Sequence, residues 1–204
     1  MPARVVVFLD YQNVYRRARD GFFQPLDPSQ RGQVSPTALG QLICGRGVGD
    51  RTLAGVRVYR GQPDSLRDPT GYGANSRQCA AWSADPLTTV VVRTLRYPFN
   101  WPAERAQEKG IDVALAIDFV MMAIRGEYDI GVLMSTDTDL KPALEAIIGM
   151  AGGNYYPRCE LAAWSVPGGH SRRLSVSGER IWCHWLSRDD YLAIADNTDY
   201  NLAP

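Results

Sequence analysis

The stretch Val5-Val6-Val7-Phe8-Leu9-Asp10-Tyr11-Gln12-Asn13 is an apolar run that ends in Asp-x-x-Asn. Its apolar residues do not alternate with polar ones, which is typical of a strand buried on both faces of a sheet. Such strands occur in parallel sheets that carry helices on both sides. The pattern therefore predicts that Asp10 emerges at the rim of a parallel sheet, with Asn13 about one helical turn further on.

Two further segments place acids next to apolar sequence. The run Ile130-Gly131-Val132-Leu133-Met134 is followed by Ser135-Thr136-Asp137-Thr138-Asp139, and Lys109-Gly110-Ile111-Asp112 opens a nearly all-apolar stretch that also holds Asp118. In an open α/β sheet, ligands bind beyond the carboxyl ends of the strands. We therefore expect Asp10 and the acids of the other two motifs to meet at one edge of the sheet.

Carboxylates that converge in this way repel one another unless a cation compensates them. The five oxygen-bearing side chains of residues 135–139 suit a hard cation such as Mg²⁺ or Mn²⁺. The alternative interpretation is helix capping, because the helix dipole favours an acid at a helix start. Capping explains one of Asp137 and Asp139, but not both. Asp118 lies about 120° around the helix from Asp112, so we expect it either to support the metal ligands from behind or to have a buried structural use.

The chain as a whole alternates predicted strands with predicted helices. Strands are expected at residues 4–9, 53–59, 88–95, 130–134, 160–165 and 181–186. Helices are expected at residues 14–19, 35–43, 75–82, 112–124 and 138–148, with a last short helix capped by residues 187–190. This order predicts a three-layer α/β fold, with a mostly parallel central sheet and helices on both faces. We expect one domain over residues 1–204, with an insertion around 60–105 and a C-terminal strand–helix extension at 171–195.

Composition limits the classes of protein to consider. The chain has 204 residues, is 45% hydrophobic and has a net charge of zero. A neutral chain lacks the electrostatic footprint of a general nucleic-acid binder, although a small basic groove is compatible with it. No apolar run is long enough to span a bilayer and no leader precedes residues 5–9, so we expect a cytoplasmic protein. The four scattered cysteines predict reduced thiols and no structural zinc.

The two lysines also lie beside the acidic motifs. Lys109 and Lys141 are the only lysines among 22 basic residues, and each lies within three residues of a candidate acid. A compact ammonium and a planar guanidinium are not interchangeable at a crowded site. Lys109 is therefore a candidate for offsetting phosphate charge, although chance could also explain the positions of two lysines.

These motifs resemble those of the NYN domain, a nuclease family with a PIN-like fold. The resemblance lies in Asp10-Tyr11-Gln12-Asn13, in Lys109-Gly110-Ile111-Asp112, and in Ser135-Thr136-Asp137-Thr138-Asp139, where Thr136 replaces the more common Gly. It implies a ribonuclease that depends on Mg²⁺ or Mn²⁺ and cleaves RNA phosphodiester bonds, and we expect it to act as an endonuclease. It also implies metal binding by Asp10, Asp112, Asp137 and Asp139, with Asn13 as a polar site residue.

Other interpretations remain open at this stage. A haloacid-dehalogenase-like phosphohydrolase would need an acid two residues after Asp10, where Gln12 stands instead. A non-catalytic or partner-regulated RNA-binding module on the same fold is the main alternative, and a protein partner or a homo-oligomer stays open. The aromatic loop Tyr97-Pro98-Phe99-Asn100-Trp101 could stack bases, although packing and rigid connection are the more common roles of such loops.

Overall fold

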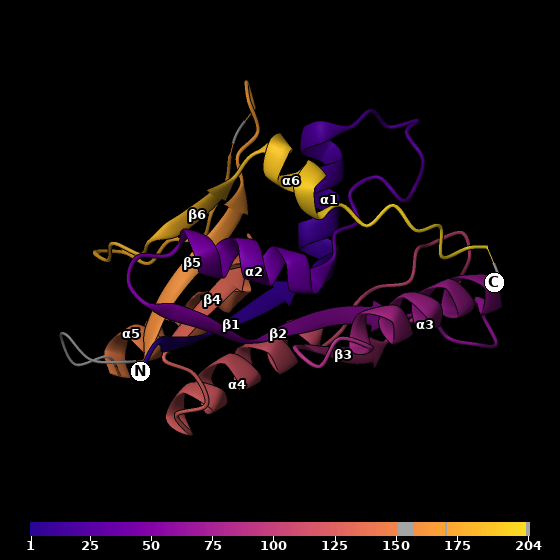
Figure 1. The fold of residues 1–204 in the computed structure, drawn as a ribbon. Helices are drawn as coiled ribbons and strands as arrows, with labels where there is room; N and C mark the ends of the chain where they lie inside the picture. The colour runs from indigo at the N-terminus through magenta and orange to yellow at the C-terminus, as the bar shows by residue number, and fades with distance from the viewer. Residues whose placement is uncertain (151–156, 170, 203–204) are drawn as a thin grey trace.

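The computed structural model describes residues 1–150, 157–169 and 171–202. Its centre is a six-stranded sheet of order β3-β2-β1-β4-β5-β6, and each neighbouring pair of strands is parallel (Figure 1). The strands are β1 (Ala3–Asp10), β2 (Arg51–Gln62), β3 (Thr88–Thr94), β4 (Ile130–Met134), β5 (Arg158–Trp164) and β6 (Cys183–Leu186). The expected α/β architecture is therefore confirmed, and the sheet is wholly parallel.

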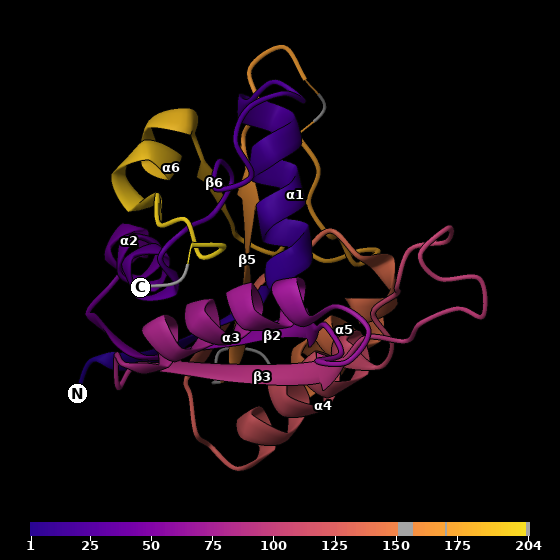
Figure 2. The ribbon, with the colours of Figure 1, turned by 90° about the vertical axis from the view of Figure 1, so that its right-hand side faces the viewer.

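Helices cover both faces of this sheet. They are α1 (Tyr11–Phe22), α2 (Pro36–Arg46), α3 (Pro69–Ser83), α4 (Ile111–Ile124), α5 (Lys141–Met150), α6 (Arg188–Ile194) and the short 3₁₀ helix η1 (Thr138–Leu140). Residues of α1, α2, α3 and α6 belong to the core on one face, whereas residues of α4 and α5 belong to the core on the other. Figure 2 shows α1, α2 and α3 on one side of the sheet and α4 on the opposite side.

The apolar run of β1 explains this layering. Val5, Val7 and Leu9 pack into the core beneath α1 and α2, while Val6 and Phe8 pack into the core beside α4 and α5. All five side chains are at most 4% exposed. Fully burying a side chain of this kind contributes about 1.5–3 kcal/mol to stability. The strand is apolar on both faces because both faces are covered, and its pairing with β2 and β4 places Asp10 at the centre of the sheet's carboxyl edge.

Two helices begin earlier than the sequence predicted. Helix α1 starts at Tyr11 rather than at residue 14, because Asp10 accepts a hydrogen bond from the Asn13 backbone and acts as the N-cap. Helix α3 starts at Pro69 rather than at residue 75, because Asp68 caps it in the same way. Residues 69–74, which precede the helix start expected at residue 75, are therefore already helical. An N-cap followed by proline is a recognisable helix start.

The predicted insertion, residues 60–105, and the predicted C-terminal extension, residues 171–195, both contribute strands and helices to the fold. Residues 60–105 contain α3 and the edge strand β3, followed by a loop that leads toward α4. Residues 171–195 contain β6, which pairs with β5, and α6, which begins with a capping box between Ser187 and Asp190. In the part of the chain that the structure describes, no helix has both the length and the apolar character needed to cross a membrane.

Candidate functional site

Asp10 lies where β1 leaves the sheet, and the residue is only 8% exposed. One oxygen accepts from the backbone N–H of Asn13 at 3.2 Å, and the other accepts from the Ser135 hydroxyl at 2.8 Å. Burial raises the pKa of Asp10 to about 6, and the negative charges of Glu108 and Asp112 act in the same direction. The two hydrogen bonds oppose this rise because they favour the ionised form. The site therefore holds a carboxylate that is costly to ionise without a nearby cation.

Asn13 joins the start of α1 to the turn that follows β4. Its amide nitrogen donates to the Thr136 hydroxyl at 3.1 Å, and its amide oxygen accepts from the Thr136 backbone N–H at 3.2 Å. Both polar ends of the amide are thus used by one residue of the turn. This contact fixes the turn that carries Asp137 against the helix that Asp10 caps, which gives Asn13 a positioning role.

Asp137 and Asp112 approach the same region from two other segments. Asp137 is the N-cap of η1, where its carboxylate accepts from the backbone N–H of Asp139 at 3.0 Å. Asp112 lies in the first turn of α4, which follows Gly110 in the left-handed region at φ 74°. Burial raises the pKa of Asp112, and the charges of Asp137 and Asp139 raise it further. Asp137 and Asp139 therefore lie near enough to Asp112 for their charges to act on its carboxylate.

An open groove of about 820 Å³ runs along this edge of the sheet. Asp10, Asn13, Asp112 and Asp137 all line it, whereas Asp139 and Lys109 do not. The charged residues that line the groove also include Arg16, Arg17, Arg105, Asp20, Glu104 and Glu108. In total, six acids and three arginines line it. Within the described residues, no three acid, histidine or cysteine side chains lie close enough together to form a complete metal-ligand set.

Glu108 is a groove residue that the sequence analysis missed. Its carboxylate accepts from the backbone N–H of Gly61 at 2.5 Å. Burial raises the pKa of Glu108, and the charge of Asp112 adds to the rise, whereas the Gly61 contact and nearby arginines oppose it. In the sequence, Glu108 could have been noticed as an acid directly before the Lys-x-x-Asp motif. The burial of Glu108, however, depends on the end of β2, which is distant in sequence.

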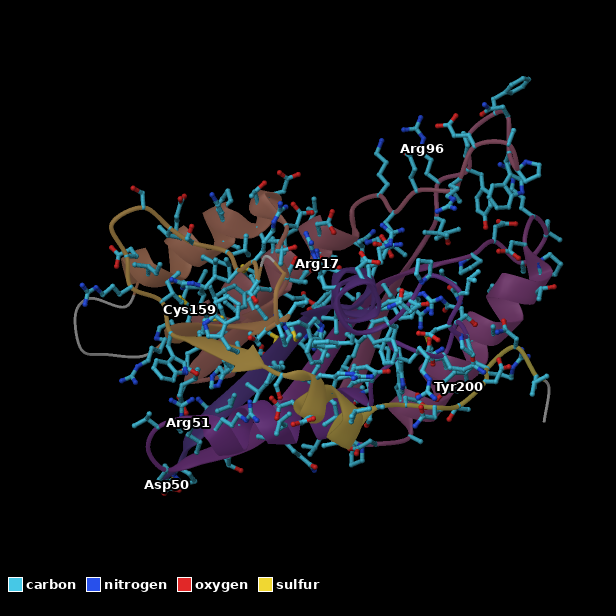
Figure 3. The ribbon with its side chains drawn as sticks, turned by 90° about the horizontal axis from the view of Figure 1, so that it is seen from above. Arg17, Asp50, Arg51, Arg96, Cys159 and Tyr200 are labelled. Atoms are coloured by element: carbon cyan, nitrogen blue, oxygen red, sulfur yellow. The ribbon has the colours of Figure 1, made fainter. Side chains whose placement is uncertain are left out.

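Arg16 and Arg17 were also missed. Both lie on α1 and line the groove, and Figure 3 shows Arg17 beside this helix. They follow Asn13 by three and four residues, so the helical period places them one turn beyond it. A predicted helix that began at Tyr11, as α1 does, would have placed both arginines one turn beyond Asn13. They supply positive charge at the wall of an otherwise acidic groove.

Asp118 lies outside the groove. It accepts from the Arg57 guanidinium and from the Tyr59 hydroxyl, each at 2.7 Å. Partial burial favours the neutral form of Asp118, but these hydrogen bonds and the charge of Arg57 lower its pKa overall. Asp118 therefore joins α4 to β2 by an ion pair, which is the structural one of the two uses expected from its position on the helix.

The aromatic loop before α4 is tied to its surroundings. The Tyr97 and Trp101 rings pack edge to face at 4.8 Å, and the Tyr97 hydroxyl accepts from the Asp64 backbone N–H. Arg96 and Gln107 pair through two backbone hydrogen bonds, and Figure 3 shows Arg96 on this loop. Phe99 is fully exposed at the tip. Two of the three aromatic residues thus serve packing, whereas residues 104–108, at the end of the loop, line the groove.

Comparisons with known proteins agree with this fold. The NYN domain family matches residues 4–152. A crystal structure of a protein of unknown function from Vibrio parahaemolyticus is similar with a TM-score of 0.50 and 16% identity, over 79% of this chain and 81% of that one. A comparison with curated proteins found no match. The residues matched by the family include all three acidic motifs, so the chain belongs to the NYN domain family, a nuclease-like family with a PIN-like fold.

Proposed function

We propose that this protein is a ribonuclease that uses a divalent metal ion, Mg²⁺ or Mn²⁺, to hydrolyse RNA phosphodiester bonds by endonucleolytic cleavage. The observation that carries the proposal is the convergence of Asp10, Asp112 and Asp137 on one groove from three separate segments. The raised pKa values of Asp10 and Asp112, with burial and neighbouring acids as causes, indicate negative charge that a cation would compensate.

The donor set fits a hard divalent ion. All candidate ligands are carboxylate oxygens, which suit Mg²⁺ and Mn²⁺ rather than softer metals. Mg²⁺ usually keeps several waters and binds through one or two carboxylates together with substrate phosphate. A complete set of three protein ligands is therefore not required. Asp10, Asp112 and Asp137 would hold the ion, with Asp139 next to them. When bound, such an ion activates water and stabilises charge on the phosphate.

The other groove residues have roles that follow from their contacts. Ser135 and Asn13 hold the carboxylate of Asp10 and the turn of Asp137 in place. Arg16 and Arg17 can pair with phosphates on either side of the cleaved bond, because phosphate contacts by arginine supply most of the affinity for a nucleic acid strand. The excess of acids over arginines would limit binding of a polyanion in the absence of the metal ion. RNA, rather than DNA, is proposed from the family resemblance.

A cleavage assay with a matched acid control tests this function. We would incubate a labelled single-stranded RNA with wild type, Asp10→Asn and Asp50→Asn, in Mn²⁺ or Mg²⁺ and in EDTA. Asp50 is exposed and precedes β2 at the edge of the sheet away from the groove (Figure 3). We expect cleavage by wild type and Asp50→Asn only with metal, and at least a hundredfold loss in Asp10→Asn, equivalent to about 2.7 kcal/mol. Metal-independent cleavage, or RNA binding without cleavage, would contradict the proposal and favour the non-catalytic module.

A further inference from the structure

A second cavity, of about 390 Å³, adjoins the acidic groove between α1, α3, the end of β2 and the C-terminal segment. We call it the amide pocket because five carboxamide side chains line it, namely Gln12, Gln33, Asn75, Gln78 and Asn201. Its wall includes Gln12, Arg16 and Glu108, which also line the acidic groove. The two cavities therefore share a boundary on the same edge of the sheet.

Two amides of the pocket keep groups that match the edge of a nucleobase. Among the described residues, the Gln33 amide nitrogen and the Asn201 amide oxygen take part in no hydrogen bond, whereas the buried Asn75 and Gln78 use both ends of their amides. A carboxamide offers both a donor and an acceptor, and amide side chains pair with the donor and acceptor pattern of base edges. Sequence-specific recognition of RNA uses unpaired bases that are hydrogen-bonded on these edges and stacked on aromatic or arginine side chains. Tyr15 and Arg60 also line the pocket and provide such surfaces. Its volume lies in the range of small-molecule sites, about 300–1,000 Å³.

The polar side chains of the pocket are held in place before any ligand binds. The Arg60 guanidinium donates to the Gln78 amide oxygen at 2.5 Å, and the Gln78 amide nitrogen donates to Gln33 at 2.8 Å. The Asn75 amide nitrogen donates to the Gly61 carbonyl at 3.0 Å. Arg60 also lies 5.4 Å from the centre of the Tyr11 ring. A preorganised site loses less entropy on binding than a mobile one.

The C-terminal segment closes one side of the pocket. The Arg77 guanidinium donates to the Tyr200 carbonyl at 2.6 and 2.9 Å, and the Tyr200 hydroxyl donates to Asp196 at 2.8 Å. Figure 3 shows Tyr200 on this segment, next to α3. These contacts hold Tyr200 and Asn201 in the pocket wall. The cavity is therefore built by residues from four parts of the chain.

We propose that the amide pocket binds one unpaired base of the RNA strand whose phosphate lies in the acidic groove, so that this base sets the position of cleavage. The presence of the strand in the groove rests on the proposed function. The binding of a base in the pocket does not, because it can be measured without cleavage.

The test uses the four 5′-mononucleotides AMP, GMP, CMP and UMP, with ribose 5-phosphate as a probe that lacks a base. Their binding to wild type, Ala74→Phe and Ala80→Phe is measured by NMR titration in EDTA. Ala74 lines the pocket, so a larger side chain there fills it, whereas Ala80 is exposed on the same helix and serves as the control. We expect wild type and Ala80→Phe to bind at least one mononucleotide at least tenfold more tightly than Ala74→Phe does, and to bind ribose 5-phosphate more weakly.

The pocket assignment is overturned if wild type binds none of the mononucleotides, if Ala74→Phe binds them as wild type does, or if ribose 5-phosphate binds equally well. The smaller change Ala74→Leu, with Ala80→Leu as its control, gives the same decision if Ala74→Phe does not fold. In the cleavage assay, Ala74→Phe should lose the base preference that wild type and Ala80→Phe show. Base binding in a protein that does not cut RNA would instead reject the proposed function and keep the pocket.

Discussion

The carboxylate of Asp137 has two roles that a single substitution can separate. It caps η1 through the backbone N–H of Asp139, and its charge contributes to the raised pKa of Asp112. Asparagine caps a helix about as well as aspartate but carries no charge. We therefore expect Asp137→Asn to raise the melting temperature in EDTA, because it removes repulsion, and to reduce the further rise that Mn²⁺ causes by binding the folded state.

Melting curves in EDTA and in Mn²⁺ check both parts of this prediction, with Asp50→Asn as the control for loss of one surface charge. Asp50→Asn should keep the metal-induced shift of wild type. If Asp137→Asn also keeps that shift, the ion binds elsewhere and Asp137 is only a helix cap.

Lys109 is exposed and does not line the groove, but it is adjacent to Glu108, which does. A charge contact made only in the transition state changes kcat, and a loss of about 1.4 kcal/mol lowers the rate about tenfold. We expect Lys109→Ala to lower kcat by at least this factor, with partial recovery in Lys109→Arg. Stability should stay within about 1 kcal/mol of wild type, as is usual for exposed positions.

Single-turnover cleavage rates and urea unfolding measure these two effects separately. Arg125→Ala is the matched control, because Arg125 is an exposed cation at the opposite end of α4. If Lys109→Ala cleaves RNA at the same rate as wild type, the lysine is only a solvated residue before the helix.

At the scale of elements, a buried ionic cluster connects three strands. Glu160 of β5 accepts from Arg51 of β2 through two hydrogen bonds of 2.9 Å and contacts His184 of β6 at 2.8 Å. Burial would raise the pKa of Glu160, but His184 and Arg51 together lower it to about 2. Because this pKa in the folded state lies below the ordinary glutamate value of 4.5, the ionised Glu160 stabilises the fold above about pH 4.5. That contribution is lost as the pH falls from there toward 2.

We therefore expect Glu160→Gln to lower the free energy of unfolding at pH 7 by about 3–5 kcal/mol, since it leaves the buried Arg51 without its carboxylate. The difference between wild type and variant should shrink as the pH is lowered from 5 to 3. Urea unfolding at pH 7, 5 and 3 measures it. A difference that is constant with pH would mean that the ionisation of Glu160 does not stabilise these strands.

Local sequence predicted some elements well and others poorly, for physical reasons. Strand β4 matches its predicted bounds, Ile130–Met134, because a buried strand is marked by its own apolar residues. The starts of α1 and α3 were placed too late, because they depend on the caps Asp10 and Asp68 rather than on apolar periodicity. A capping side chain is a weaker signal than a run of apolar residues.

At the scale of the whole molecule, the parallel topology brings distant residues together. The sequence predicted that Asp10, Asp112 and Asp137 would share an edge, because the carboxyl ends of parallel strands share one, and all three line the groove. It could not predict Glu108 or the amide pocket. Both depend on how loops and the C-terminal segment fold back against β2 and α3, and no local pattern specifies that.

Sequencing of RNA ends tests most directly whether the acidic groove cuts RNA with a bound divalent ion. A pool of single-stranded RNA would be incubated with wild type or Asp10→Asn, in Mn²⁺ or EDTA, and the new 5′ and 3′ ends mapped. We expect new internal ends only when wild-type protein and metal are both present. Ends that are equally abundant with Asp10→Asn or in EDTA, or no new internal ends under any condition, would contradict it.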